Sequence, residues 1–265
     1  MRKHVETVDT ASQSAPKDFV TALQKGLDVL TCFRRGASRL TLSEVSRLTG
    51  SSPASARRSL RTLHTLGYVE SDGKRFWIAP RALLVANAYI TSRPIPQLAQ
   101  PLLVSLSERT RESASLGQLL DDDVIIVARA TARRSLSTGL AIGSRLPAYC
   151  SAMGRALLAS LPPDVARRRI EASHGAALTA RTRWRVADVL AEVALCRERG
   201  WSESDGELEL GVRSMAVPVF DREGTTVGAM SIAVQAERME MAEFRELLPA
   251  LRKARDTLAT RLPPE

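Results

Sequence analysis

The sequence predicts an α+β fold in two parts, and three observations support that prediction. Positive charge gathers at one end: residues 1–90 carry 14 Lys and Arg against 7 Asp and Glu, whereas residues 91–265 carry 24 against 22, which leaves the chain at +9. The basic end holds three helical patterns, then two strand patterns around an Asp-Gly turn. The remainder alternates hairpin patterns with amphipathic helices, which is typical of an antiparallel sheet covered by helices.

Length and composition narrow the class of protein. A chain of 265 residues, 44% of them apolar, is long enough for two domains with separate cores. No apolar run approaches the ~20 residues of a membrane helix. Residues 1–18 lack the apolar core of a secretion signal, so we expect a disordered arm and a cytoplasmic protein. The three cysteines and three histidines are scattered, so we expect no disulfide framework, no metal site and no cofactor.

Two helices are predicted at the start of the basic end. Residues 19–35 form the first, because Leu23, Leu27 and Leu30 recur at helical spacing. The second begins at Thr41, where Thr41 and Glu44 have the spacing of a capping box. A short polar turn follows, which can hold the second helix at a steep angle to a third.

The third predicted helix covers residues 53–66, with Ser52 as its N-cap and Pro53 at its first position. Ala56 and Leu60 mark its buried face. The opposite face is small at its tip and basic along its length, with Ala54, Arg58, Arg61 and Thr65 at its centre and Ser55 and Arg57 beside them. A DNA-recognition helix needs both features, because small residues admit it to the major groove and arginines bind guanine edges or phosphates.

A hairpin completes this part of the chain. Residues 68–78 read as two strands around Asp72-Gly73, and Lys74 and Arg75 place positive charge near the tip. We therefore predict a winged helix–turn–helix domain at residues 19–79 that binds double-stranded DNA. An ordinary solvated basic face is the alternative, and the combination of cap, turn, hairpin and charge makes it the weaker one. The predicted contact residues are Thr41, Ser52, Ala54, Ser55, Arg57, Arg58, Arg61, Lys74 and Arg75.

An apolar helix connects the two parts. Residues 80–92 are rich in Ala and Leu, and Pro94 then starts a new element, so we place the domain boundary here. The helix could pack on its own hairpin or on its copy in a homodimer. We favour the homodimer, because groove-reading domains usually act in symmetric pairs.

Residues 93–265 form the second predicted domain, with an antiparallel sheet and packed helices. Helices are expected at residues 95–110, 151–161, 187–199 and 244–262, the last with a kink at Pro249, and strands at 113–120, 124–130, 135–140, 212–220 and 225–234.

No enzyme motif occurs in this domain. A Gly-x-Ser-x-Gly elbow, a phosphate loop and a His-Glu-x-x-His pattern are all missing from the sequence. Cys150 precedes a helix start, which could lower a thiol pKa, but no histidine lies at a recognisable spacing from it. A binding domain is therefore favoured. The alternatives are an enzyme acting on a small organic acid with an attached DNA-targeting module, and an architectural DNA-binding protein without a ligand.

Residues 143–154 are the most distinctive segment of this domain. Turn-forming residues lead into a helix start, whose backbone N–H groups can bind an anion. Leu146, Tyr149 and Met153 could supply apolar and aromatic walls. This combination suits a small carboxylate with a flat apolar body, although a core loop without a ligand would look much the same.

Four blocks of sequence resemble the IclR family of bacterial transcriptional regulators. They are TGSSPASARRSLRTLHTLGYVE (49–70), GSRLPAYCSAMGRALLASLP (143–162), DGELELGVRSMAVPV (205–219) and GAMSIAV (228–234). The resemblance runs over residues 19–262. The LPAYCSAMGR and ASARRSLRTL segments are most similar to the branch that regulates aromatic-acid catabolism, including protocatechuate and 4-hydroxybenzoate regulators.

The resemblance implies a regulator that binds operator DNA under the control of a small aromatic acid. It implies a GAF-like or profilin-like effector-binding domain at residues 93–265, and homodimers that pair through the N-terminal part, often as homotetrameric dimers of dimers. Some members have Cys where Ser214 stands, and Ala233 replaces a second Ser, which favours a ligand larger than glyoxylate. The implied effector-binding residues are Leu146, Tyr149, Cys150, Ser151, Ala152, Met153, Asp205, Ser214 and Ser231.

Overall fold

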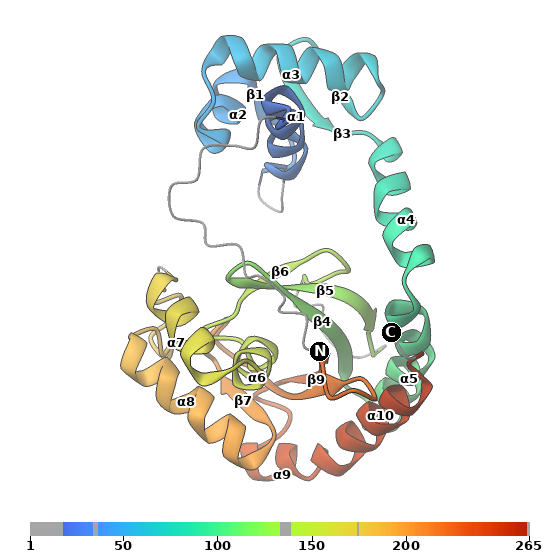
Figure 1. Cartoon of the computed structure of the whole chain (residues 1–265), viewed down its shortest axis with the longest axis vertical. Helices are drawn as coiled ribbons and strands as arrows, with labels where there is room; N and C mark the ends of the chain where they lie inside the picture. The colour runs from blue at the N-terminus through green and yellow to red at the C-terminus, as the bar shows by residue number, and fades with distance from the viewer. Residues whose placement is uncertain (1–17, 34–36, 133–138, 174, 264–265) are drawn as a thin grey trace. The chain divides into compact units, whose positions relative to one another are not determined.

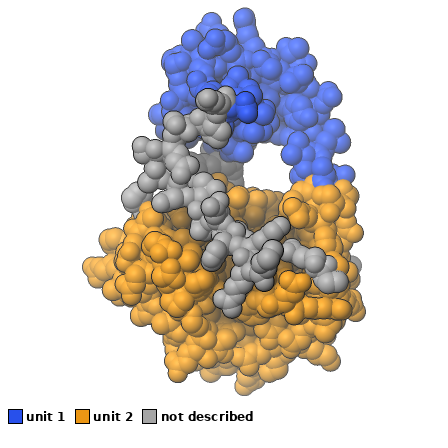
Figure 2. Space-filling view, in the orientation of Figure 1, with its two compact units in different colours: residues 1–88 blue, residues 89–265 orange. Residues whose placement is uncertain are grey.

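A computed structural model describes residues 18–33, 37–132, 139–173 and 175–263. The chain divides into two compact units, Met1–Ala88 and Tyr89–Glu265 (Figure 2). The predicted N-terminal arm, apart from Asp18, and most of the strand expected at 135–140 lie outside the described residues.

Unit 1 is a winged helix–turn–helix, as the sequence predicts. It contains α1 (Thr21–Thr31), β1 (Leu40–Thr41), α2 (Leu42–Thr49), α3 (Pro53–Thr65), β2 (Val69–Ser71), β3 (Arg75–Ile78), the 3-10 turn η1 (Pro80–Ala82) and the start of α4 (Leu83–Ser92). The three strands form an antiparallel sheet in the order β1-β3-β2, so the wing includes a short strand that precedes α2 in the chain.

Local chemistry explains the tight turn of this unit. The Thr41 side chain accepts the N–H of Glu44 at 3.3 Å, and the Glu44 carboxylate accepts the Thr41 N–H at 2.7 Å, so the predicted capping box is confirmed. Gly50 ends α2 with φ 63°, a left-handed conformation that favours glycine.

The apolar residues that recur along α1 are not all buried in the core of the unit, as a core-facing helix would require. Val29 is the fully buried residue of α1, whereas Leu23 and Leu27 are 62% and 52% exposed. Leu30, the third residue of the predicted stripe, packs with Val29 against the core, so only the C-terminal end of the stripe faces the core.

Unit 2 has the predicted α+β architecture. Its helices are α5 (Pro94–Thr110), α6 (Ala152–Ser160), α7 (Pro163–Ala172), α8 (Val186–Arg199), α9 (Met241–Arg245) and α10 (Leu248–Arg261). Its strands are β4 (Ser113–Leu120), β5 (Asp123–Ala130), β6 (Arg145–Pro147), β7 (Ser202–Asp205), β8 (Val212–Phe220) and β9 (Thr226–Gln235). They form one antiparallel sheet in the order β6-β5-β4-β9-β8-β7.

Helices cover both faces of this sheet (Figure 1). Helices α5 and α10 pack on one face, and α6, backed by α8, packs on the other. Each face has its own core, so successive residues of one strand enter different cores.

Three elements of unit 2 differ from the sequence prediction. The strands β6 and β7 were not expected, because each is short and gains its hydrogen bonds only at an edge of the sheet. The final helix is broken into α9 and α10, and Pro249 lies in the first turn of α10 rather than at a kink. Proline is tolerated there because its missing N–H would have no partner within the helix. Within the described residues, no helix combines the length and the apolar character needed to cross a membrane.

Candidate functional site

The exposed face of α3 carries the predicted arginines. Arg57, Arg58 and Arg61 are all exposed, and so is Ala54 at the tip of the helix. Ser55 differs from the prediction, because it is only 7% exposed and lies on the side of α3 that faces the core. Its N–H donates to Ser52 Oγ at 3.3 Å, so Ser52 is the N-cap as predicted.

The wing has a fixed tip with basic side chains outside it. Asp72 Oδ1 accepts the backbone N–H groups of Lys74 at 2.9 Å and Arg75 at 2.7 Å. These two hydrogen bonds hold the pKa of Asp72 below its usual value. Both Lys74 and Arg75 are exposed. The predicted surface is thereby built from two elements, the face of α3 and the wing.

Two further residues belong to this surface in different ways. The Thr41 N–H and hydroxyl both donate to Glu44 Oε2, at 2.7 and 2.8 Å, and these two hydrogen bonds lower the pKa of Glu44. The Thr41 hydroxyl therefore serves the cap of α2. Sequence reasoning missed Arg39, whose guanidinium carbon lies 4.3 Å from the centre of the Trp77 ring on β3. The pairing of Leu40 with Phe76 brings Arg39 to the wing, and no local sequence pattern predicts that pairing.

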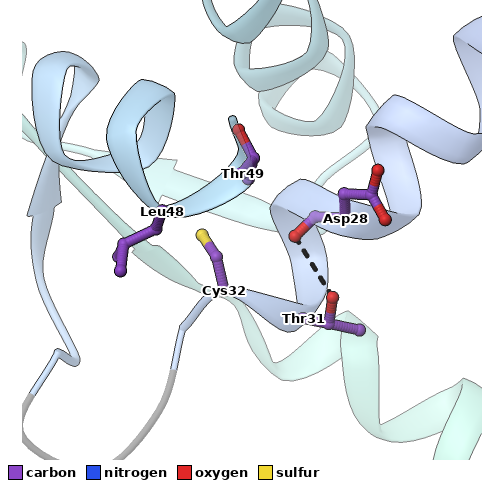
Figure 3. Close-up of a pocket in the computed structure, with 5 residues that line it drawn as sticks. All are labelled: Asp28, Thr31, Cys32, Leu48 and Thr49. Atoms are coloured by element: carbon purple, nitrogen blue, oxygen red, sulfur yellow. Dashed lines mark hydrogen bonds between the residues drawn. The ribbon is translucent and has the colours of Figure 1, made fainter. Parts of the chain in front are cut away.

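A separate cleft of about 360 Å³ lies between α1 and α2 (Figure 3). It is lined by Asp28, Thr31, Cys32, Leu48 and Thr49. The Thr31 hydroxyl donates to the Asp28 carbonyl oxygen at 3.1 Å, and the Cys32 sulfur lies beside α2. None of the predicted DNA contacts lines this cleft.

In unit 2, strand register creates a polar face on the sheet. Ser115 on β4 pairs with Arg129 on β5 and with Ser231 on β9. Ser214 on β8 pairs with Ala233 on one side, and with Ser204 on the other. Because directly opposed residues point to the same side of a sheet, these small and polar side chains line the face under α6.

A cavity of about 60 Å³ lies between this polar face and the start of α6. Its lining consists of Ser115, Arg129, Leu140, Leu146, Ser151, Ala152, Met153, Ser204, Leu208, Glu209, Val212, Ser214, Ser231 and Ala233. Six of the nine predicted effector-binding residues are therefore brought together: Leu146, Ser151, Ala152, Met153, Ser214 and Ser231.

Tyr149, Cys150 and Asp205 are placed outside this lining. The Tyr149 hydroxyl donates to the Ala176 carbonyl oxygen at 2.8 Å, and burial raises the tyrosine pKa. Cys150 is completely buried, and burial raises its thiol pKa to about 11, so at neutral pH it is no nucleophile. The Asp205 carboxylate instead contacts Arg181 and Arg213, each at 3.1 Å.

The N-cap residue Ser151 already uses some of the backbone N–H groups at the start of α6. The Ser151 hydroxyl accepts the N–H of Gly154 at 3.1 Å, and the Ser151 N–H donates to the Pro147 carbonyl oxygen at 3.2 Å. Of the amides at 151–153 expected to bind an anion, that of Ser151 is thus already used. The amides of Ala152 and Met153 are the helix-start donors that remain at the cavity.

A buried ion pair holds the loops around the cavity. The guanidinium of Arg155, with no exposed surface, donates to both carboxylate oxygens of Glu207 at 2.7 and 2.6 Å. Arg155 Nε also donates to the Tyr149 carbonyl oxygen at 3.0 Å, and Glu207 accepts the N–H of Arg183 at 2.9 Å. The pair joins α6 to the loop that carries Leu208 into the cavity.

Sequence reasoning also missed Ser115, Arg129 and Ser204. Part of the signal was present as alternation. Ser113, Ser115 and Gly117 occupy every second position of β4, and Ala229, Ser231 and Ala233 occupy every second position of β9. Arg129 carried no such signal, since a single arginine at the end of a strand reads as a solvated side chain. In the part of the chain that the structure describes, no group of three His, Cys, Asp or Glu side chains could hold a metal ion.

Comparison with protein families agrees with this geometry. Residues 87–260 match the family described as bacterial transcriptional regulator IclR C-terminal, and residues 22–73 match the IclR helix-turn-helix domain. The chain belongs to the IclR family. It is therefore a DNA-binding transcriptional regulator with an effector domain, and the expectation that it is not an enzyme is confirmed, since the IclR family consists of regulators.

Individual relatives indicate which branch of the IclR family the chain is most similar to. The chain is 36% identical to the Pca regulon regulatory protein of Pseudomonas putida, over 92% of this chain and 85% of that one. It is 32% identical to the p-hydroxybenzoate hydroxylase transcriptional activator of Acinetobacter baylyi, over 91% and 92%. These relatives confirm the predicted aromatic-acid branch.

Ligand complexes occur among the similar solved structures. One of them is a double mutant of the inducer-binding domain of the PobR transcription factor from Acinetobacter, in complex with 3-hydroxybenzoic acid. It is 30% identical to this chain with a TM-score of 0.59, and the match covers 63% of this chain and 98% of that one.

Proposed function

We propose that this IclR-family regulator changes its operator binding when a small aromatic carboxylate enters the cavity under α6. The observation that carries the proposal is the cavity itself, where apolar side chains from the 143–154 segment and α6 face a row of serine hydroxyls on the sheet. Apolar walls hold a ring, while convergent hydroxyls orient its polar substituents. The relatives named for p-hydroxybenzoate and 3-hydroxybenzoic acid support the same ligand class.

The size of the cavity sets a condition on binding. At about 60 Å³ it holds little more than ordered water, so a benzoate-sized ligand must displace side chains at its mouth. Leu208 and Glu209 line the cavity from the loop that follows β7, and Glu209 is exposed. We assign the effector-binding role to the nine predicted residues, six through the cavity lining and Tyr149, Cys150 and Asp205 through the loops that support it.

DNA binding is assigned to residues 19–79, connection to 80–92 and effector binding to 93–265. Arg58 and Arg61 enter the major groove, while Arg57, Lys74 and Arg75 contact phosphates. Ser52, Ala54 and Ser55 form or support the tip of α3, and Thr41 caps the start of α2. The protein acts in the cytoplasm, where bacterial DNA lies.

The regulator acts as a homodimer that pairs through its N-terminal part, and two dimers can associate further. Helix α4 supports this, because Leu83, Leu84 and Val85 are 69%, 61% and 62% exposed within one chain. Large apolar side chains clustered on one exposed helix mark an interaction surface. A second copy of the chain supplies the symmetry that a two-fold operator requires.

Titration of the full-length protein tests the proposal. Isothermal titration calorimetry with 4-hydroxybenzoate, 3-hydroxybenzoate and protocatechuate should detect binding of at least one acid, and the same acid should alter operator affinity in a gel shift. Ala152→Trp should fill the cavity, so that operator binding persists but its response to the acid is lost. Arg58→Ala should weaken operator binding by about 1–3 kcal/mol without altering affinity for the acid. A wild-type protein that binds none of the three acids contradicts the proposed effector class.

A further inference from the structure

We infer that Arg129 binds the carboxylate of the effector, an inference that rests on the proposed function. Arg129 lies near the end of β5, and its guanidinium Nη1 donates to Ser115 Oγ on β4 at 2.8 Å. The side chain therefore reaches across one strand toward the middle of the polar face. Its place in the cavity lining puts a fixed positive charge beside the serine hydroxyls.

The positions of the charged side chains favour an anion beside Arg129. Among the described residues that line it, Arg129 is the one cation and Glu209 the one anion, and Glu209 is exposed. Arg129 is half-buried, and burial lowers its pKa, which shows that removal from water disfavours its charge. A carboxylate that enters the cavity can accept hydrogen bonds from the guanidinium, and such charge-assisted hydrogen bonds are strong and directional.

The spacing of the strands matches a ring with polar groups at both ends. Ser115 on β4 and Ser214 on β8 are separated by β9, so they lie two strand spacings apart, about 10 Å. A hydroxybenzoate with its carboxylate at Arg129 and Ser115 extends its ring over Ser231 and Ala233. Its ring hydroxyl then points toward Ser214 and Ser204.

This orientation reverses the one expected from the start of α6. A helix N-terminus carries roughly half a unit of positive charge, whereas a guanidinium carries a full unit. The cap formed by Ser151 further reduces the number of amides available there. The helix start therefore faces the ring or its hydroxyl, and Arg129 takes the carboxylate.

Matched acid and amide ligands test the inference. Titration calorimetry is performed on full-length wild type, Arg129→Met and Arg129→Lys with 4-hydroxybenzoate and 4-hydroxybenzamide, and likewise with 3-hydroxybenzoate and its amide. Arg222→Met is the control, because Arg222 is exposed on the β8–β9 turn, does not line the cavity, and donates to the Thr260 carbonyl oxygen. Wild type should prefer acid over amide by about 10- to 100-fold, and Arg129→Met should lose that preference through weaker binding of the acid alone.

The outcomes separate the inference from the proposed function. Arg129→Lys should retain part of the acid preference, and Arg222→Met all of it. If Arg129→Met prefers the acid as strongly as wild type does, the carboxylate lies elsewhere while the proposed effector class stands. If Arg129→Met does not fold, the wild-type ratio still decides, since equal affinity for acid and amide overturns the inference. Wild type that binds no acid at all overturns the proposed function first.

Discussion

The two faces of the six-stranded sheet are made from alternate residues of the same strands, yet they have opposite character. Toward α5 and α10, β9 presents Met230 and Ile232, which are completely buried among other large apolar side chains. Toward α6, the same strand presents Ala229, Ser231 and Ala233, which leave a cavity. One face is filled by large side chains, whereas the other is kept open by small ones.

This difference shows how one sheet combines stability on one face with a binding site on the other. Burial of apolar area stabilises the face under α5 and α10 without specific geometry. The face under α6 has less apolar bulk, so hydrogen bonds and the Arg155–Glu207 ion pair hold its loops in position. The two faces should therefore respond to mutation in different ways.

The largest effect is expected from Glu207→Ala. Removal of the carboxylate leaves the completely buried Arg155 without its bidentate partner, which should lower the free energy of unfolding by about 3–5 kcal/mol. Chemical denaturation followed by circular dichroism measures this. Asp164→Ala is the control, since the Asp164–Arg168 pair is exposed and should contribute less than about 1 kcal/mol. A similar small loss for both variants would mean that the buried pair does not hold the α6 side together.

Ile232→Ala and Ser231→Ala compare the two faces at adjacent positions of β9. Ile232→Ala should cost about 2–5 kcal/mol, because it leaves a void in a filled core. Ser231→Ala should cost less than about 1.5 kcal/mol and instead weaken binding of the acid. Denaturation and calorimetry on both variants measure the two quantities. Loss of ligand affinity in Ile232→Ala with unchanged stability would contradict the view that one face stabilises the sheet and the other binds the ligand.

Gly154→Ala probes how closely α6 approaches the segment before it. A Cβ at position 154 would lie 2.2 Å from the Ala148 Cα and 2.3 Å from its carbonyl oxygen. The backbone must shift, so a loss of about 1–3 kcal/mol in stability is expected. Gly26→Ala in α1 is the matched control, because nothing lies within 4 Å of its added Cβ. It should stabilise the protein by about 0.5–1 kcal/mol, and thermal denaturation reports both signs.

The smallest effect concerns thiol chemistry on the α6 side. Burial raises the pKa of Cys150 and Cys196 to about 11, from an ordinary value of 9.0. Because the raised pKa favours the neutral thiol in the folded state, their contribution to stability is complete below pH 9 and is lost as pH rises through about 11. Iodoacetamide at pH 8 should therefore modify partly exposed Cys32 well before these two, as mass spectrometry would show. Early modification of Cys150 would indicate that the α6 side opens readily.

The sequence alone determined the fold class, most element positions and the main features of the DNA-binding unit. The capping box at Thr41, the N-cap at Ser52 and the basic face of α3 depend on residues within one helical turn of one another, so local spacing was sufficient. The family blocks likewise led to six residues that line the cavity. Hydrophobic periodicity also located β4 and β8 at their observed ends.

Tertiary structure decided what depends on pairing across the chain. Arg129, Ser115 and Ser231 meet because β4 lies between β5 and β9, and the register of three strands is not encoded in any one of them. The Tyr149 hydroxyl binds the Ala176 carbonyl oxygen, and the Asp205 carboxylate binds Arg181 and Arg213. These partners lie in other segments of the chain, so local spacing does not predict them. Local spacing predicts which face of an element a residue occupies, whereas only the packed sheet decides what that face meets.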